Sequence, residues 1–417
     1  MNILLGILKY PPDYAGDGLR LHRSMQRWMH KGSLSKAYVL TSWDDASSRD
    51  VIALDGVRIL RPVECTCKSK FEGSSHWLKR IIVPLQSLRI IFVYLRIYRG
   101  IDLVLTAGSG WFPSLIGWLA ILTGKPLVKE TVLLGSDDPM SLVKNKSPRT
   151  RWFFTWPFRW ADLIITISPP LEKACLLFGI PKEKIWSRFN PIEIANGAED
   201  QSTHLAAETD LPIILWVGTV RERKNVEFLM RAACSLPVPA RVLFVGPCPD
   251  ASYLEKLKAI QKNLPSYVEV QFLKFIHNPK TLARLYSKAK IFWFASKKEG
   301  MGNVIGESLM SGTPVVTLPV MGIMKEVIPS AEDGEIVETD NPRIFARTAA
   351  RWLYKKVDRN AIAQRARLRF DPKKIDEDYL FRFNQIVKQH TSSRIRNWKL
   401  GSESAVSQPV TIGNMHL

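Results

Sequence analysis

Cysteines, long apolar runs and acidic residues are all scarce in this chain, and each shortage excludes a class of protein. Only five cysteines occur among 417 residues. Cys65-Thr-Cys67 lacks the two-residue spacer and the second pair of a zinc site. Such an odd, sparse count indicates reduced thiols in a cytosol-like compartment. The longest apolar run, residues 111–124, is shorter than the roughly 20 residues that span a bilayer, so no transmembrane helix is expected. The N-terminal "MNILLGILKYPPDY" favours a buried first strand over a signal peptide.

The shortage of acidic residues leaves the chain strongly basic. It has 59 Lys and Arg against 39 Asp and Glu, a net charge of +20, and an isoelectric point near 9.8. This balance favours a polyanionic partner: nucleic acid, an anionic membrane face, or a phosphate-bearing substrate. No paired zinc ligands or RNA-binding aromatic motifs occur, so nucleic acid is not an expected partner.

Short apolar runs alternate with helical patterns throughout, which predicts an α/β protein with doubly wound parallel sheets. The expected strands are residues 2–8, 36–42, 102–107, 125–131 and 162–168 in the first half, and 213–219, 240–246, 268–273, 290–296 and 314–318 in the second. We expect an N-terminal Rossmann-like domain over 1–190, a linker over 191–211 and a C-terminal Rossmann-like domain over 212–372, facing each other across a cleft. A helix over 373–390 is expected to pack back on the N-terminal domain, and a disordered tail to occupy 391–417.

A glycine-rich loop in the second half, "SKKEGMGNVIGESLMSGTPVV" (296–316), is the most informative stretch. Its glycines at 300, 302 and 306 are spaced one residue too widely for a dinucleotide fingerprint. A glycine turn entering a helix still presents free backbone N–H groups and a positive helix terminus, which suit a phosphate. Glu299 and Glu307 could accept hydrogen bonds from sugar hydroxyls, whereas on spacing alone they would be ordinary solvated glutamates.

Together with its flanks, 285–296 and 308–316, this loop resembles the E-x7-E element of the retaining, GT-B-type glycosyltransferases of family 4 (glycosyl transferases group 1). The resemblance implies the GT-B fold and a nucleotide-sugar donor. It implies that Glu299 contacts the donor sugar and Glu307 the ribose. The donor would also meet the adjoining residues Gly300, Met301, Gly302, Asn303 and Val304.

Two further stretches extend the resemblance. "LWVGTVRERKNVEFLMRA" (215–232) implies donor contact at Gly218 and a catalytic basic pair, Arg223 and Lys224, that neutralises the departing diphosphate, with Arg221 as a rival to Arg223. Thr219 and Asn225 depart from the family's usual residues. "PPDYAGDGL" (11–19) implies that Ala15, Gly16 and Gly18 border the diphosphate and the acceptor.

One departure concerns the acceptor side. Many members carry a histidine where this chain has "KETVLLGSDDPMS" (129–141). Asp137 or Asp138 would take the acceptor-side role, or the pair would form a helix cap or a solvated turn.

The resemblance thus implies retaining transfer from a nucleotide sugar, without a cofactor, to a lipid-linked or other glycan acceptor in bacterial cell-surface polysaccharide synthesis. No D-x-D or His/Cys ligand cluster is evident, so we expect metal independence. Two basic, aromatic segments, 77–99 and 139–160, fit a cytoplasmic enzyme peripheral on the anionic inner face of the membrane, or else a core with a solubilising surface. The alternatives are a non-catalytic sugar-nucleotide or polyanion binder, and an epimerase or phosphorylase of the same architecture.

Overall fold

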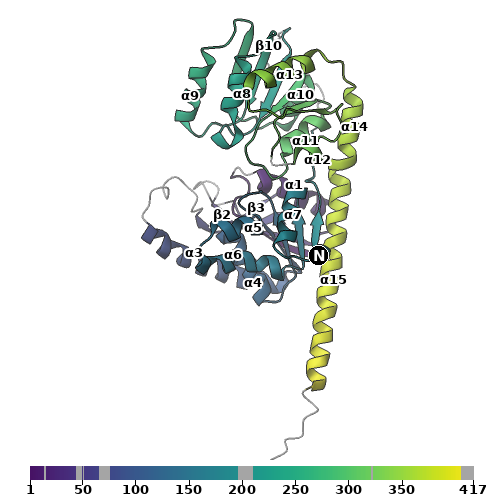
Figure 1. The fold of residues 1–417 in the computed structure, drawn as a ribbon. Helices are drawn as coiled ribbons and strands as arrows, with labels where there is room; N and C mark the ends of the chain where they lie inside the picture. Colours follow the sequence, from purple (N-terminus) through teal and green to yellow (C-terminus); the bar gives the residue numbers. More distant parts are fainter. Residues whose placement is uncertain are drawn as a thin grey trace, which may run out of the picture.

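The computed structural model describes residues 1–13, 16–43, 49, 51–64, 76–195, 210–320 and 323–404. Ala15, Cys65, Cys67 and most of the expected linker, residues 196–209, lie outside the described residues. Two α/β domains follow each other along the chain, and a long C-terminal helix runs beside them (Figure 1).

The N-terminal domain is built on an eight-stranded sheet with the order β3-β4-β2-β1-β5-β6-β7-β8. All of its strand pairs are parallel except β3 with β4. The strands are β1 (Asn2–Gly6), β2 (Lys36–Trp43), β3 (Ala53–Leu54), β4 (Val57–Glu64), β5 (Leu103–Ala107), β6 (Leu127–Thr131), β7 (Leu163–Thr166) and β8 (Ile185–Ser187). The helices are α1 (Gly16–His30), α3 (His76–Ile97), α4 (Trp111–Leu122), α5 (Pro139–Asn145), α6 (Pro148–Trp160) and α7 (Pro169–Leu177), with 3₁₀ turns η2 (Tyr98–Gly100) and η3 (Lys182–Lys184).

The C-terminal domain has a six-stranded parallel sheet with the order β11-β10-β9-β12-β13-β14. Its strands are β9 (Ile213–Val217), β10 (Ala240–Val245), β11 (Val268–Leu273), β12 (Ile291–Phe294), β13 (Val315–Thr317) and β14 (Gly334–Ile336). Its helices are α8 (Val226–Ala233), α9 (Ala251–Gln261), α10 (Pro279–Lys288), α11 (Asn303–Met310), α12 (Met324–Val327), α13 (Pro342–Tyr354) and α14 (Arg359–Phe370), and η4 covers Glu222–Lys224. The expected doubly wound α/β architecture is confirmed.

Both sheets are buried on their two faces, which is why their central strands are almost wholly apolar. In the N-terminal domain, α1 and α15 (Pro372–Ser404) share one core with side chains from one face of the sheet. Helices α3, α4 and α6 share a second core with side chains from the other face. The outer surface of α3, α4 and α6 therefore lies on the side of the sheet opposite α15.

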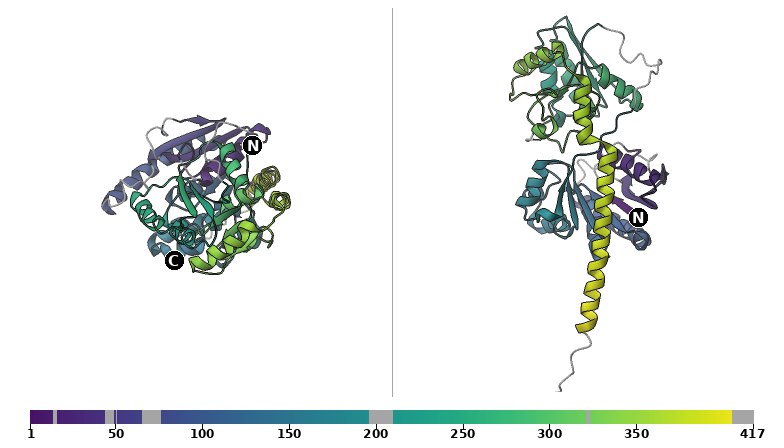
Figure 2. Two further views of the ribbon diagram at one scale, coloured as in Figure 1. Left: turned by 90° about the horizontal axis from the view of Figure 1, so that it is seen from above. Right: turned by 90° about the vertical axis from the view of Figure 1, so that its right-hand side faces the viewer.

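The last two helices join the domains. Helix α14 packs into the C-terminal core through Ile362, Ala366 and Phe370, and α15 then crosses to the N-terminal domain (Figures 1 and 2). There, the ring of Trp28 in α1 meets the rings of Tyr379 and Phe383 at centroid distances of 5.9 and 5.7 Å.

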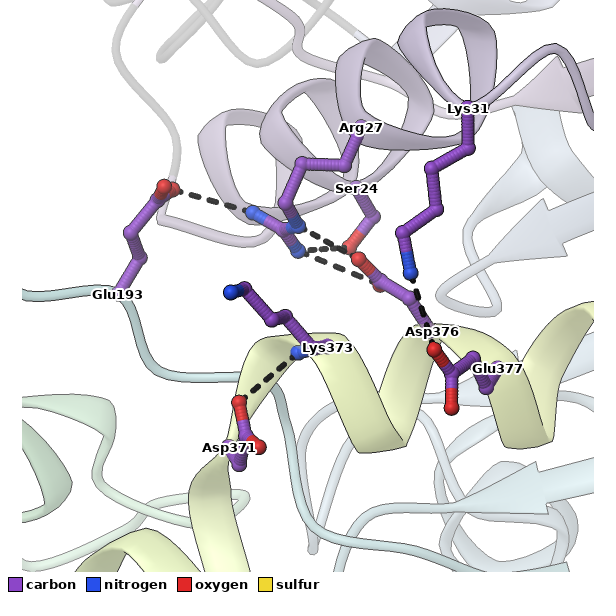
Figure 3. A network of polar contacts seen from close by, with 8 residues as sticks. All are labelled: Ser24, Arg27, Lys31, Glu193, Asp371, Lys373, Asp376 and Glu377. Carbon is purple, nitrogen blue, oxygen red and sulfur yellow. Dashed lines mark hydrogen bonds and ion pairs between the residues drawn. The ribbon is translucent and has the colours of Figure 1, made fainter.

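Arg27 ties α15 and the linker to α1 (Figure 3). Its guanidinium donates to Asp376 of α15 at 2.5 Å and to Glu193 of the linker at 3.0 Å. Lys31, directly after the end of α1, pairs with Glu377 at 3.1 Å. These contacts fix the point at which the chain passes between the two domains.

The C-terminal helix is longer than the sequence indicated. It continues to Ser404, so the prediction of a disordered tail from residue 391 is wrong for residues 391–404, while 405–417 lie outside the described residues. The physical reason is that no proline occurs between Lys373 and Gln408, so nothing in this stretch breaks the helix that begins at Pro372. Within the described part of the chain, no helix is long and apolar enough to cross a membrane.

Candidate active site between the two domains

A cavity of about 600 Å³ lies between the two domains, in the range usual for small-molecule sites. One wall comes from the N-terminal domain, at the loop after β1 and the first turns of α1. The linker closes one side, and the other wall is formed by the carboxyl ends of β9 and β10 with α10 and α11. Lining residues that carry the following argument are Arg23, Glu193, Gly218, Gly246, Tyr286, Val304 and Glu307.

The cavity floor depends on two glycines that let the chain turn sharply after adjacent strands. Gly218 follows β9 and its N–H donates to Val245 O at 2.9 Å, while Gly246 follows β10. A Cβ atom on Gly246 would lie 2.0 Å from Gly218 O, and its φ of +139° is one that side chains rarely adopt. The turns therefore bring bare backbone to the cavity, and both glycines are among its lining residues.

Glu307, on α11, lines this cavity. It is the residue for which the resemblance implied contact with the ribose. The Tyr286 hydroxyl donates to Glu307 Oε2 at 2.8 Å. Burial raises the pKa of Glu307, and the Tyr286 hydrogen bond and the charge of Arg23 oppose that shift. Because Arg23 belongs to α1, the carboxylate responds to both domains.

The glycine loop before α11 packs closely against the N-terminal domain. A Cβ atom on Gly300 would lie 1.9 Å from Val132 O and 2.9 Å from the side chain of Ile167. Met301 is buried and its sulfur accepts from the N–H of Asn190, whose side chain donates to Asn303 Oδ1 at 2.8 Å. These contacts hold the loop on the N-terminal domain and the start of the linker.

Only part of the expected donor loop therefore faces the cavity. Val304 and Glu307 line it, whereas Gly300 and Met301 are buried at the contact between the domains. Gly302 has a φ of +82° and begins α11 without a side-chain cap, so the first N–H groups of the helix receive no capping side chain.

Glu299, Lys224 and Arg223 form a charged cluster beside the glycine loop. Lys224 Nζ lies 2.5 Å from Glu299 Oε1, and Arg223 Nη1 lies 3.3 Å from the same oxygen. Arg223 also donates to Lys298 O at 2.5 Å, and the N–H of Lys297 donates to Arg223 O. Arg223 thus reaches the E-x7-E loop, while Arg221 is exposed at the start of η4.

Two carboxyl groups of the N-terminal domain lie in the same electrostatic environment. Burial raises the pKa of Asp17, at the start of α1, to about 6, with Arg20 opposing the shift and Glu130 and Glu299 adding to it. Burial also raises the pKa of Asp137 to about 6, and Lys129 opposes that shift. Raised carboxyl pKa values of this kind are frequent at functional sites.

The two aspartates proposed for the acceptor side have different surroundings. The carboxylate of Asp138 accepts from the N–H groups of Ser141 and Gly135, both at 2.8 Å, and so caps α5. The helix-cap alternative therefore describes Asp138. Asp137, in contrast, is only half-buried and lies beside Lys129.

The glycine-bearing loop at the start of α1 is partly described. Gly16 is exposed at the first position of the helix. A Cβ atom on Gly18 would lie 2.5 Å from Lys9 O, so close packing of α1 on the preceding loop requires glycine there. Neither glycine is among the residues that line the cavity.

The sequence did not single out Arg23, Tyr286 or Asp17. Tyr286 and Arg23 act on Glu307, which is at least 21 positions away from either of them, so no short motif contains both partners. Asp17 has Arg20 close by in the sequence, but Glu130 and Glu299, which add to its pKa shift, lie more than 100 positions away. Asp17 lies within "PPDYAGDGL", and its place beside the loop glycines was a signal that could have identified it. Among the described residues, no group of three His, Cys, Asp or Glu side chains could hold a metal ion.

The C-terminal domain is similar in sequence to known proteins. Residues 198–369 match the family model "Glycosyl transferases group 1". The chain is 31% identical over 194 residues to "Uncharacterized glycosyltransferase MJ1607" of Methanocaldococcus jannaschii, a match that covers 44% of this chain and 48% of that protein. It is 30% identical over 224 residues to "N-acetylgalactosamine-N,N'-diacetylbacillosaminyl-diphospho-undecaprenol 4-alpha-N-acetylgalactosaminyltransferase" of Campylobacter jejuni, covering 53% of this chain and 59% of that protein. The matches thus span only about half the length of these relatives.

A solved structure is similar over nearly the whole chain. Anabaena Alr3699/HepE, in complex with UDP and glucose, matches with a TM-score of 0.71 and 17% identity, covering 92% of this chain and 100% of the other. At that identity the likeness shows the fold alone. The chain therefore has the GT-B fold, and its residues 198–369 resemble the glycosyl transferases group 1 family.

Proposed function

We propose that the protein is a retaining glycosyltransferase that moves a sugar from a nucleotide-sugar donor to a lipid-linked or other membrane-proximal glycan acceptor. The observation that carries the proposal is the position of Glu307 in an inter-domain cavity, next to a glycine loop that begins a helix. A carboxylate in such a cavity suits vicinal hydroxyls of a ribose. The relatives' names support this choice, because the Anabaena structure contains UDP and glucose and the C. jejuni enzyme is named for a diphospho-undecaprenol acceptor.

The residues that line the cavity and those of the charged cluster beside the glycine loop divide the work of the transfer. Tyr286 holds one oxygen of Glu307 and so orients the carboxylate for the nucleoside. Lys224 and Arg223 supply positive charge for the departing diphosphate, where preorganised charge lowers the barrier most. Glu299 orients both cations and can accept from donor-sugar hydroxyls. With the leaving phosphate on the same face as the incoming hydroxyl, the anomeric configuration is retained.

Asp137 is our candidate for the acceptor side. Its half-buried carboxyl lies in the N-terminal domain, in the stretch where many family members carry histidine. We also propose that transfer needs no divalent metal, because Lys224 and Arg223 already provide two cations at the loop. Activity that survives chelation by EDTA is the expected result, and activity lost with EDTA and restored by Mg²⁺ would contradict this part of the proposal.

The first test is thermal-shift screening of the full chain against UDP-, GDP- and ADP-sugars, with EDTA present. A ligand that binds only the folded protein raises the melting temperature by mass action. We expect one nucleotide family to stabilise the protein and Glu307→Ala to abolish the shift. Glu338→Ala, at an exposed position away from the cavity, is the matched control. No shift with any nucleotide, in a protein shown to be folded, would contradict the assignment of the cavity.

A second measurement separates the enzyme from a non-catalytic binder. Donor hydrolysis and sugar transfer to a polyprenyl diphosphate-linked acceptor are followed for the parent protein, Lys224→Ala and Glu299→Gln, and the anomeric configuration of the product is read by NMR. We expect both variants to bind nucleotide but to transfer far more slowly. Nucleotide binding without hydrolysis or transfer by the parent protein would favour the binder, and an inverted product would exclude a retaining mechanism.

A further inference from the structure

Three neighbouring helices of the N-terminal domain present an exposed apolar surface. Helix α4 contacts both α3 and α6, and Figure 1 shows the three helices together, on the side of the N-terminal domain away from the C-terminal domain. Their inner sides fill one core cluster, and large hydrophobic side chains remain on their outer sides. We call the following exposed residues the α3/α4/α6 face: Leu85, Leu88, Phe92, Leu95, Leu122, Trp152, Trp156 and Trp160.

The tryptophans of this face are spaced four residues apart along α6 and so lie on one side of the helix. Trp152 is 54% exposed and Trp160 is 56% exposed, although tryptophan side chains are mostly buried in folded proteins. Trp156 stacks on Trp160 and on Trp118 of α4, at centroid distances of 6.2 and 6.0 Å. The rings therefore form a packed, preordered ladder and not a set of isolated surface residues.

Helix α3 extends the apolar surface beside α4. Leu85, Leu88, Phe92 and Leu95 are each at least half exposed, with Leu88 at 63%. Spacings of three and four residues between Leu85, Leu88, Phe92 and Leu95 place them on one side of the helix. This row adds exposed apolar surface made mainly of aliphatic side chains. Nucleic-acid bases stack on aromatic rings, so a nucleic acid would leave this surface unused.

The charge around these helices is mostly positive. Residues 76–161 contain twelve Lys and Arg but only four Asp and Glu. Glu130 is buried in an ion pair with Arg20, Asp138 caps α5, Asp137 lies beside Lys129, and Asp102, which is exposed just before β5, accepts from the N–H of Asn2. Exposed cations on the helices themselves include Arg89 and Arg96 of α3 and Arg149 and Arg159 of α6.

We propose that the α3/α4/α6 face docks on an anionic lipid bilayer, with the α6 tryptophans at the headgroup level and the surrounding arginines on lipid phosphates. Aromatic rings with a polar edge, aliphatic side chains and a mostly cationic rim are the combination that an interfacial protein uses. A second copy of the chain would place the same cations against each other, which disfavours self-association through this face. The inference deepens the proposed function, because it names the surface that brings a lipid-linked acceptor to the enzyme.

The test is co-sedimentation of the full chain with vesicles of phosphatidylcholine alone, or of equal parts phosphatidylcholine and phosphatidylglycerol, at low and high salt. We expect binding to the anionic vesicles that salt weakens. The double variant Trp152→Ala/Trp160→Ala should reduce partitioning by about tenfold or more, since each exposed indole loses apolar contact area. The double variant Arg89→Gln/Arg149→Gln should reduce partitioning onto the anionic vesicles roughly 25-fold at low salt, because each lost charge accounts for about fivefold.

Matched controls lie on the C-terminal domain. Tyr354→Ala removes an equally exposed aromatic ring and Arg343→Gln removes an exposed cation, both on α13. Neither should change vesicle binding. Circular dichroism and the nucleotide-induced thermal shift confirm that each variant is folded with its cavity intact, so a failure of the surface proposal stays distinct from a failure of the proposed function.

Two results would overturn the inference. The first is equal partitioning of parent protein and face variants on anionic vesicles. The second is that the parent protein does not bind vesicles and is dimeric in solution, while the Trp152→Ala/Trp160→Ala variant is monomeric. That result would make the face an interface between two copies of the chain.

Discussion

Gly300→Ala is expected to damage transfer while leaving folding nearly intact. The added Cβ would stand 1.9 Å from the carbonyl oxygen of Val132 and 2.9 Å from Ile167. Gly300 belongs to the C-terminal domain, and both of its neighbours belong to the N-terminal domain. The two domains can therefore relieve the clash by separating, without unfolding either core.

Gly312→Ala provides the matched comparison within one domain. Its Cβ would lie 2.5 Å from Arg359 O, in α14 of the same domain, and its φ is +75°. Overpacking costs about 1–3 kcal/mol and the left-handed backbone about 1–2 kcal/mol, so we expect a loss of about 2–5 kcal/mol of unfolding free energy. For Gly300→Ala we expect a loss of unfolding free energy below about 1 kcal/mol. The two domains can open the cleft slightly, and the core of neither domain then has to accommodate the added methyl group.

The cost of Gly300→Ala should appear in catalysis. Moving the Cβ from 1.9 Å to an allowed separation of at least 3.0 Å opens the cleft by about 1 Å at the loop that carries Glu299. A misplacement of that size can cost about 100-fold in rate.

Urea denaturation and transfer kinetics test the two variants side by side. We expect Gly312→Ala to lose stability and Gly300→Ala to lose kcat with its nucleotide-induced thermal shift retained. An equal loss of stability in both variants, or full transfer by Gly300→Ala, would show that the contact between Gly300 and Val132 is not part of the working closed state.

Three further changes test the electrostatics of the site. Because burial raises the pKa of Asp137 to about 6, above its ordinary value of 3.8, its carboxylate costs stability above pH 6 and the cost disappears as the pH falls below 4. Asp137→Asn should therefore raise the unfolding free energy by roughly 1–3 kcal/mol at pH 7 and change little below pH 4, as measured by urea denaturation across pH; an equal gain at both pH values would refute the assignment. Glu130→Gln leaves Arg20 buried without its partner, at 2.8 Å in the parent protein, and should cost about 3–5 kcal/mol in the same assay, whereas Glu338→Gln should be neutral. Tyr286→Phe removes the hydrogen bond to Glu307 and should weaken nucleotide binding about fivefold by calorimetry, with unchanged affinity excluding Glu307 from the nucleoside site.

The central strands of both sheets were predictable because their burial leaves a direct mark on the sequence, whereas β3, β4, β8 and β14 were not among the expected strands. In β5, all five residues of "LVLTA" are buried, and the run stands out against its polar flanks. Strand β4 was missed because "VRILRPVE" mixes charged residues and a proline with its apolar ones. The end of α15 was missed for a different reason: residues 391–404 lack apolar periodicity, yet they follow a helix that nothing interrupts.

The site was predictable only where one segment carries the chemistry. Glu299 and Glu307 lie in a single loop and helix, so their spacing identified them. Other interactions depend on how two domains or several strands pack. They are the effect of the Arg23 charge on Glu307, the helix cap by Asp138 and the ion pair between Glu130 and Arg20. Such contacts are set by tertiary structure, and spacing along the chain contains no measure of them.

The charges between the domains are arranged unequally, and this explains which end of the site suits which part of a donor. Glu307 is held by a neutral Tyr286 hydroxyl and its negative charge is opposed by Arg23, which leaves it an acceptor for hydroxyl groups. Glu299 instead has Lys224 and Arg223 on one oxygen, so that end carries an excess of positive charge. For the transfer that we propose, the nucleoside then belongs at the first end and the diphosphate at the second, because only the second gains from the charge that develops as the sugar leaves.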